Sequence, residues 1–237
     1  MTLKNIDIPI GLDPAEATRI LKGAAGEADL GKRIDRISER FLGRRYAEGS
    51  LGGGPEFPEE FRVSLKVFDC VTYIETVLAL AFARTIDEFI DAIRRIRYED
   101  GEIDWFRRNH YMADWAWNNK ESGFIKNITS GPNTAEKMCT LSLIAGLPAK
   151  TTTFHYFPPQ CSGEVAELVE KGDVILFVST RQTLDVFHAG VLVDREGRLL
   201  LRHAARTACA VIEQELVEFI RQNKMAGFVL LRPLCRR

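Results

Sequence analysis

The sequence has no long apolar run and no ordered set of cysteines. No stretch approaches the roughly 20 apolar residues of a membrane-spanning helix, so we expect no membrane segment. The five cysteines are scattered and odd in number, without a C-x-x-C pair. That spacing argues against a disulfide framework and against structural zinc. His155 and Cys161 flank one turn, but this loop offers too few ligands for a metal.

The chain also has little net charge, formally −1 over 237 residues. It therefore has no general attraction for nucleic acid or an anionic membrane surface. The sequence leaves the oligomeric state open. Its first twenty residues lack a basic segment followed by an apolar one, so no secretory signal is visible. This favours a cytoplasmic protein, whereas a chain already trimmed to its mature form would be periplasmic.

Hydrophobic periodicity changes along the chain from helical to extended. Apolar residues at helical spacing predict helices at about 13–24, 28–42, 69–84, 86–97, 133–145 and 213–223. Runs rich in branched residues predict strands at 174–178, 186–193, 198–204 and 227–234. The expected fold class is α+β, with helices first and an antiparallel sheet after them.

Cys70 lies where a loop turns into the apolar helix FDCVTYIETVLALA. A thiol in the first turn of a helix is favoured as the thiolate by the helix dipole. Asp69 suits the N-cap position, although its charge opposes thiolate formation. A lone cysteine in an apolar helix more often serves packing, so Cys70 needs partners before it indicates catalysis.

Two histidines in the predicted hairpin supply such partners. A turn centred on residues 195 and 196 pairs residues whose numbers sum to 391, which places His188 directly opposite His203. Directly opposed side chains are close enough for two imidazoles to form a hydrogen bond. Cys70 would then be the nucleophile, His188 its base and His203 the group that orients the base. The alternative is that each histidine is a satisfied core residue.

Several strings resemble the N-acetylmuramoyl-L-alanine amidase-like family, a branch of the NlpC-type, papain-like cell-wall hydrolases. They are LGRRYAEGSLGGGPE, FDCVTYIETVLALA, RYEDGEIDWFRRNHYMADWAWNN, DVFHAGVLV, LLLRHAA and GFVLLRP, covering about residues 41–233. The resemblance implies a papain-like core, with a nucleophile helix packed on an antiparallel sheet. It implies one domain over 1–237, with a helical extension at 1–45 and a mostly helical insertion at about 85–170 that shapes the cleft.

The resemblance also implies a reaction: hydrolysis of the amide between N-acetylmuramic acid and L-alanine in peptidoglycan fragments, with a preference for anhydro-muropeptides. The partner is then a small glycopeptide, and no cofactor is needed. Cys70, His188 and His203 match the catalytic positions, and Tyr46 matches a tyrosine that lines the site. One departure is Ala205, where we expect a small hydroxyl residue two positions after His203.

A polar, aromatic stretch supplies candidates for substrate binding. It contains all three tryptophans, Trp105, Trp115 and Trp117. Aromatic faces with amide and guanidinium donors suit a sugar that carries carboxylates. With Asp69 and Tyr46, the candidates are Arg108, Asn109, His110, Tyr111, Asp114 and Trp115. The alternative is a helix whose aromatic side chains are buried.

Three other functions stay open. An enzyme of the same fold would cut the peptide stem between D-glutamate and a diamino acid. A degenerate hydrolase fold would only bind wall fragments. An acyltransferase would use the same thiol on lipid or thioester substrates, although the polar, aromatic stretch argues against it.

Overall fold

The computed structural model describes residues 8–235, apart from the side chains of residues 164 and 165. Its helices are α1 (Pro14–Ala24), α2 (Leu30–Glu39), α3 (Cys70–Phe82), α4 (Ile86–Arg97), α5 (Met112–Glu121), α6 (Ser162–Ala166) and α7 (Leu216–Gln222). Short 3-10 turns occur at Glu99–Gly101, Trp105–Arg107 and Pro159–Cys161. The strands are β1 (Arg45–Tyr46), β2 (Val67–Phe68), β3 (Ile125–Asn127), β4 (Ala135–Leu141), β5 (Lys150–Tyr156), β6 (Val174–Val178), β7 (Val186–Arg195), β8 (Arg198–Ala205), β9 (Ala210–Glu215) and β10 (Gly227–Pro233).

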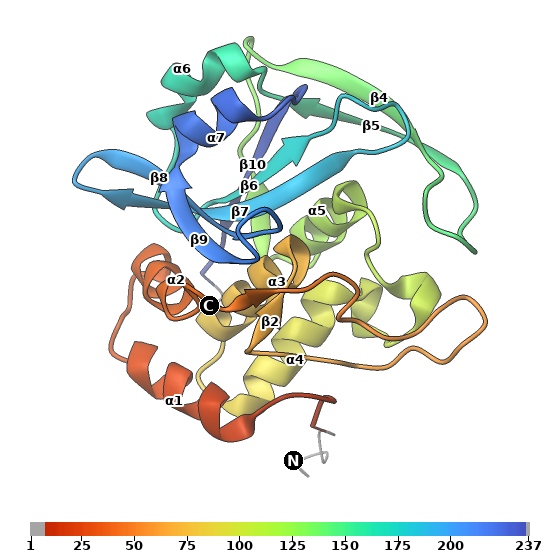
Figure 1. Ribbon diagram of the computed structural model, residues 1–237, viewed down its shortest axis with the longest axis vertical. Helices are drawn as coiled ribbons and strands as arrows, with labels where there is room; N and C mark the ends of the chain where they lie inside the picture. Colours follow the sequence, from red (N-terminus) through yellow and green to blue (C-terminus); the bar gives the residue numbers. More distant parts are fainter. Residues whose placement is uncertain (1–7, 236–237) are drawn as a thin grey trace.

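Eight strands form one sheet in the order β2-β1-β9-β8-β7-β6-β10-β3. All its neighbours are antiparallel except β1 and β2, which pair in parallel. Strands β4 and β5 form a separate two-stranded sheet. Helices α1 to α5 lie on one side of the large sheet, and α6 and α7 lie on the other (Figure 1). The expected α+β class with an antiparallel sheet is confirmed.

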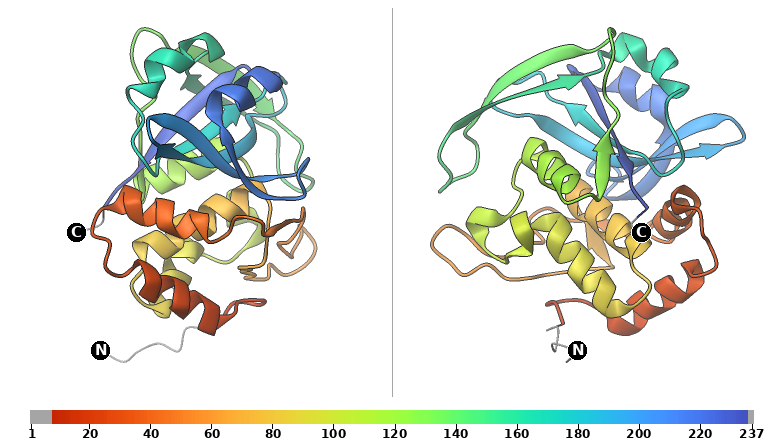
Figure 2. Two further views of the ribbon diagram at one scale, coloured as in Figure 1. Left: turned by 60° about the vertical axis from the view of Figure 1, so that its left-hand side comes forward. Right: turned by 180° about the vertical axis from the view of Figure 1, so that it is seen from behind.

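Helix α3 forms the centre of the main core. Asp69 caps it by accepting hydrogen bonds from the amides of Val71 and Thr72, and the Thr72 hydroxyl accepts from the Asp69 amide. Its side chains are buried from Thr72 to Ala81, because α2 and α4 cover one side and β7 and β8 the other. The views from the side and from behind show α3 enclosed in this way (Figure 2). A helix buried on all sides places its first residue, Cys70, firmly against the sheet.

The second core lies on the opposite face of the sheet, beneath α7. It includes Phe177 from β6, Leu192 from β7, Leu201 from β8 and Phe219 from α7. Alternate residues of β7 therefore point into different cores, with Ala189 and Val191 facing the α3 side. None of the helices within residues 8–235 has the length and hydropathy of a membrane span.

Most predicted elements agree with the structure, but the helix predicted at 133–145 is wrong. Residues Ala135–Leu141 form β4, paired with β5 along seven residues. Burial alternates along it, with Lys137, Cys139 and Leu141 turned inward. Because the inward face includes a lysine, the sequence of β4 does not show the alternation of apolar and polar residues that normally indicates a strand. The insertion at 85–170 is consequently mixed rather than mostly helical, since it contains β3, β4 and β5.

The predicted hairpin register is also wrong, by two residues. Val191 pairs with Arg202, so paired numbers sum to 393. The loop is Glu196–Gly197, with φ values of 56° and 80°. A two-residue hairpin turn of this kind needs positive φ at both positions, and glycine adopts it without steric cost. A shift of two residues keeps every side chain on its predicted face.

A buried ion cluster joins α2 to the sheet. The guanidinium of Arg202, which is fully buried, contacts Asp35 at 2.8 Å and Glu213 at 2.5 Å. Asp35 also forms ion pairs with Arg195 at 2.7 Å and with Lys171 at 3.2 Å. Because a buried charge is costly unless it is paired, Asp35 and Glu213 together balance the buried guanidinium of Arg202.

Candidate active site

Cys70 is the first residue of α3, as the sequence predicts. Its sulfur accepts a hydrogen bond from the amide of Ala189 on β7. Burial, and then the charge of Asp69, raise the pKa of the thiol to about 12, against the opposing effect of the amides of Ala189, Cys70 and Val71. The expectation of a favoured thiolate is therefore wrong for the unliganded protein, because burial outweighs the helix dipole.

The two histidines meet although they are not directly opposed. Nε2 of His188 lies 2.6 Å from Nδ1 of His203, and the rings stand nearly perpendicular at 84°. The β7–β8 ladder ends at Val191 and Arg202, so both histidines lie beyond its end. In this register His188 and His203 are diagonal neighbours, which long or aromatic side chains can span. The predicted contact between the two imidazoles is confirmed, but it forms in a different β7–β8 register from the one predicted.

Aromatic rings enclose the pair on the α7 side of the sheet. The His188 ring stacks on Phe177 and on Phe219, with centroids 6.1 and 5.4 Å away. Burial and the neighbouring His203 lower the pKa of His188 to about 3. Burial lowers the pKa of His203 to about 4, against the effect of its hydrogen bond with Gln214. Both imidazoles are therefore neutral at physiological pH.

Gln214 on β9 determines which nitrogens carry protons. Its Oε1 lies 3.4 Å from Nε2 of His203, and an amide oxygen can only accept. Nε2 of His203 is then the donor, which leaves Nδ1 of the neutral ring as an acceptor. His188 consequently donates from Nε2, and its Nδ1 keeps a lone pair. Sequence reasoning missed Gln214, which only the pairing of β8 with β9 brings to the histidines.

A cavity of about 230 Å³ brings Cys70 and His188 together with His110 and Tyr111, and His203 does not line it. We call it the Cys70 cavity; its lining includes Cys70, His188, His110, Tyr111, Leu143 and Asp185. Within residues 8–235, no hydrogen bond joins the Cys70 sulfur to an imidazole. The sulfur bonds to the Ala189 amide instead, one residue along β7 from His188. His188 lines the same cavity, and its ring stacks on Phe219 of α7.

Two buried side chains shape this cavity, and sequence reasoning missed both. Asp185 accepts hydrogen bonds from the amides of Ala113, in the first turn of α5, and Val186. The Lys137 ammonium, on β4, donates to the carbonyls of Ser179, Arg181 and Leu184 at 2.5 to 3.0 Å. The β6–β7 loop is therefore fixed to both α5 and the β4–β5 sheet.

Four of the predicted binding residues lie at or beside the Cys70 cavity. His110 and Tyr111 line it, and the Tyr111 hydroxyl accepts from the amides of Leu143 and Ile144. Asp69 is the helix cap described above. The Tyr46 hydroxyl donates to Glu48 at 3.1 Å. Burial and then Glu48 raise the pKa of Tyr46, and the charges of Cys70 and Asp69 contribute.

The other predicted binding residues lie elsewhere. Arg108 contacts Glu59 at 2.9 Å and lies over the Trp105 ring, so its guanidinium is used within the protein. Asn109 is buried and donates to the carbonyl of Ile96. Trp115 is 0% exposed, so a substrate cannot reach its side chain. Asp114 pairs with Lys150 at 2.5 Å and borders a second cavity.

The described residues contain no cluster of three or more His, Cys, Asp or Glu side chains that could hold a metal ion. His155 is exposed and lies 3.9 Å from Glu136. Cys161 contacts the carbonyl of Asn133. The polar groups around Cys70 include the carboxylates of Asp69 and Asp185, the imidazoles of His110 and His188, and backbone amides. A thiol with an imidazole and amide donors in one cavity suits acyl transfer.

The fold has known structural relatives. A protein from Legionella pneumophila superposes with a TM-score of 0.83 at 22% identity, over 93% of this chain and 94% of that one. An N-acetylmuramoyl-L-alanine amidase from Bacteroides uniformis gives a TM-score of 0.78 at 26% identity, over 86% and 98%. A search of curated proteins finds no match. The N-acetylmuramoyl-L-alanine amidase-like family matches residues 36–228, which include Cys70 and both histidines, and the chain belongs to that family.

Proposed function

We propose that this protein is a cysteine amidase with a papain-like core. It hydrolyses the amide bond between N-acetylmuramic acid and L-alanine in peptidoglycan fragments, preferentially anhydro-muropeptides. The observation that carries the proposal is the 2.6 Å contact between His188 and His203 beside a cavity that also contains Cys70. Family membership and the amidase from Bacteroides uniformis support the choice of bond.

The reaction begins with the lactyl carbonyl of the sugar in the Cys70 cavity. The sulfur leaves the Ala189 amide and attacks the carbonyl carbon while Nδ1 of His188 takes the thiol proton. The resting thiol and imidazole are both neutral, so proton transfer accompanies attack rather than preceding it. The amide of Cys70, at the positive end of α3, stabilises the oxyanion.

Collapse of the tetrahedral intermediate breaks the amide. His188 returns its proton to the departing nitrogen of L-alanine, and a thioester remains on Cys70. Water, deprotonated by His188, then attacks the thioester and releases the muramic acid with a free carboxylate. His203 holds the His188 ring through both steps, and its neutral form lets it accept from Nε2.

Mass spectrometry of the products from a defined muropeptide tests the proposal. The wild-type protein should release a free peptide that begins with L-alanine, and Cys70→Ala should lower turnover at least a thousandfold. Cys209→Ala is the matched control, because that thiol is exposed and lies outside the Cys70 cavity. Parallel reactions with anhydro and reducing muropeptides measure the sugar preference.

Two results would contradict the amidase. Cleavage between D-glutamate and the diamino acid would assign the enzyme to the peptide stem. Binding of muropeptides without turnover by the wild-type protein would make it a binding module.

A further inference from the structure

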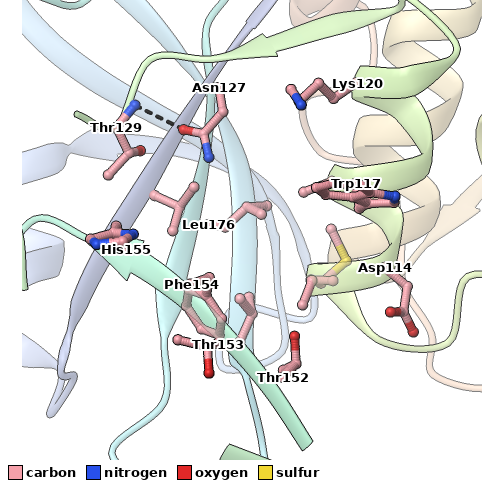
Figure 3. Close-up of a pocket in the computed structure, with 15 residues that line it drawn as sticks. Asp114, Trp117, Lys120, Asn127, Thr129, Thr152, Thr153, Phe154, His155 and Leu176 are labelled. Carbon is pink, nitrogen blue, oxygen red and sulfur yellow. Dashed lines mark hydrogen bonds between the residues drawn. The ribbon is translucent and has the colours of Figure 1, made fainter. Parts of the chain in front are cut away.

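A second cavity, of about 360 Å³, shares two lining residues with the Cys70 cavity. Figure 3 shows this second cavity. This volume falls within the roughly 300–1,000 Å³ of small-molecule sites. Helix α5 forms one wall and strand β5 the other. We call it the Trp117 cavity; its polar lining includes Asp114, Trp117, Lys120, Asn127, Thr152 and His155. Met112 and Val186 line both cavities, so one ligand can extend from one to the other.

Helix α5 turns one face toward this cavity. Asp114, Trp117 and Lys120 recur every three residues and therefore share a side of the helix. Trp115 and Asn119, on the other side, are buried in the core. The Trp117 side chain is 62% exposed, although tryptophan is usually highly buried. A large aromatic face is therefore available at the cavity wall.

Hydrogen-bonding groups that have no partner among the described residues also line the cavity. Oδ1 of Asn127 accepts from the amide of Thr129 at 2.8 Å, which fixes the side chain and leaves its NH₂ group as a donor. Figure 3 shows that NH₂ group directed into the cavity. Thr152 adds a hydroxyl from the opposite wall. Together these groups can donate to and accept from a neutral polar ligand.

The floor of the cavity is apolar. It consists of core residues of the large sheet, Leu176 on β6, Val186 on β7 and Val229 on β10. An apolar floor beneath an amide donor and a hydroxyl suits a small apolar substituent on a polar ring, such as an acetyl methyl group.

The charges favour a neutral ligand over an anion. Lys120 lies 3.1 Å from Glu121, and its ammonium is 4.9 Å from the Trp117 ring centre. Asp114 pairs with Lys150 at 2.5 Å. Among the described residues that line the cavity, a carboxylate would therefore find no guanidinium and only one lysine, Lys120, which already has a partner. Lys120 covers one face of the indole and leaves the other to a ligand.

We propose that the Trp117 cavity binds the N-acetylated amino-sugar ring of the substrate, with a C–H face of the pyranose on the indole and the acetamido group near Asn127. This inference rests on the proposed function, because it places the sugar on the acyl side of the bond that Cys70 attacks. It makes Trp117, rather than the buried Trp115, the aromatic residue that contacts substrate.

Calorimetric titration of the Cys70→Ala protein tests the inference without turnover. The ligands are N-acetylmuramoyl-L-alanyl-D-isoglutamine and the same dipeptide without its sugar. We expect the sugar to tighten binding at least tenfold. In the Cys70→Ala protein, Trp117→Ala should weaken binding of the sugar-bearing ligand at least tenfold, and Asn127→Ala should weaken it several-fold. Phe106→Ala is the matched control, since this ring is 57% exposed in the preceding segment and lines neither cavity.

The inference is overturned if Trp117→Ala binds the sugar-bearing ligand as tightly as its parent, or if it weakens both ligands equally. Failure of the sugar-bearing ligand to bind at millimolar concentration also overturns it. If the wild-type protein cleaves no muropeptide but Trp117 still governs sugar affinity, the amidase proposal fails and the sugar site stands. If cleavage is normal and Trp117→Ala does not change the affinity for the sugar-bearing ligand, the sugar site fails and the amidase proposal stands.

Discussion

At the residue scale, burial controls the protonation of the groups that the proposed reaction uses. The thiol of Cys70 has a pKa of about 12, and His188 has one of about 3. An unperturbed imidazole would titrate near 6.5 and an unperturbed thiol near 8.5. The resting site is thus a neutral thiol beside a neutral base, not an ion pair.

This predicts how alkylation of Cys70 by iodoacetamide depends on pH. Because the thiolate is the reactive form, the rate should rise about tenfold per pH unit from 6 to 9 without a plateau. The Cys70-specific rate is measured by peptide mapping, with the exposed Cys209 as the internal reference. A plateau near neutral pH would show a preformed thiolate and contradict the neutral resting state.

The pH profile of kcat/KM follows from the same shifts. His188 acts as a base when unprotonated, and its lowered pKa keeps it so down to about pH 3. We therefore expect no loss of kcat/KM on passing from pH 7.5 to 5.5 through the ordinary histidine range. A tenfold fall in that interval would mean that the base titrates as an unperturbed imidazole.

Gln214 can be tested separately from folding. Replacing it with leucine keeps the volume but removes the acceptor that orients His203. Because a neutral hydrogen bond contributes about 1 kcal/mol, we expect kcat to fall roughly fivefold to tenfold with KM little changed. Gln214→Glu retains an acceptor oxygen and should recover most of kcat. Equal loss in both variants would show that the side chain acts only through packing.

At the scale of secondary-structure elements, the two histidines depend on how closely β7 and β8 approach. Gly190 lies between them: a Cβ there would come within 2.5 Å of Leu201 Cδ1, 2.7 Å of the Arg202 carbonyl oxygen and 3.1 Å of His203 Cβ. The absence of a side chain at this position lets the diagonal contact form.

Gly190→Ala should therefore push the strands apart. We expect a loss of about 1–3 kcal/mol in the free energy of unfolding, as for other overpacked sites, and at least a tenfold loss of kcat. Urea denaturation and steady-state kinetics measure the two effects. Gly26→Ala is the control, since a Cβ there meets nothing within 4 Å. Unchanged activity in Gly190→Ala would show that the two imidazoles need not touch.

The elements also show what sequence patterns could predict. Helix α3, its Asp69 cap and the faces of β7 and β8 follow from local periodicity. The register did not, because the expected turn at Arg195–Glu196 and the observed turn at Glu196–Gly197 both preserve the alternation, and only Gly197 distinguishes them. Strand β4 was missed because Lys137 points inward, and Gln214 because its role needs a third strand. The sequence could not tell which of Trp115 and Trp117 is exposed, because elements far away in the sequence determine which side of α5 is buried.

At the scale of the whole molecule, the buried histidines link stability to pH. Their pKa values fall from about 6.5 in an unfolded chain to about 3 and 4 in the fold. The unfolded state binds these protons first, so their contribution is complete above pH 6.5 and is lost as pH falls toward 4.

We therefore expect the free energy of unfolding to fall between pH 6.5 and 4, by up to about 1.4 kcal/mol per pH unit for each histidine. Urea titrations at pH 7, 6 and 5 measure it. In His188→Asn, the free energy of unfolding should depend less steeply on pH, because only one of the two histidines still takes up a proton on unfolding. An identical slope in this variant would mean that other groups govern acid stability.

The Asp35 cluster shows that the folding unit extends beyond the residues that the family match covers. The family match begins at residue 36, one position after Asp35, the carboxylate that neutralises buried Arg202. Helix α1, which also precedes the match, adds Ala17, Ile20 and Leu21 to the main core. A protein shortened to residues 36–228 would keep every proposed catalytic group and the Arg202–Glu213 pair, yet it would lose the Asp35 carboxylate that Arg202, Arg195 and Lys171 contact, and it would expose the core surface that α1 covers. The boundaries of a shortened protein should therefore be chosen to keep Asp35 and the core contacts of α1, rather than from the extent of the family match.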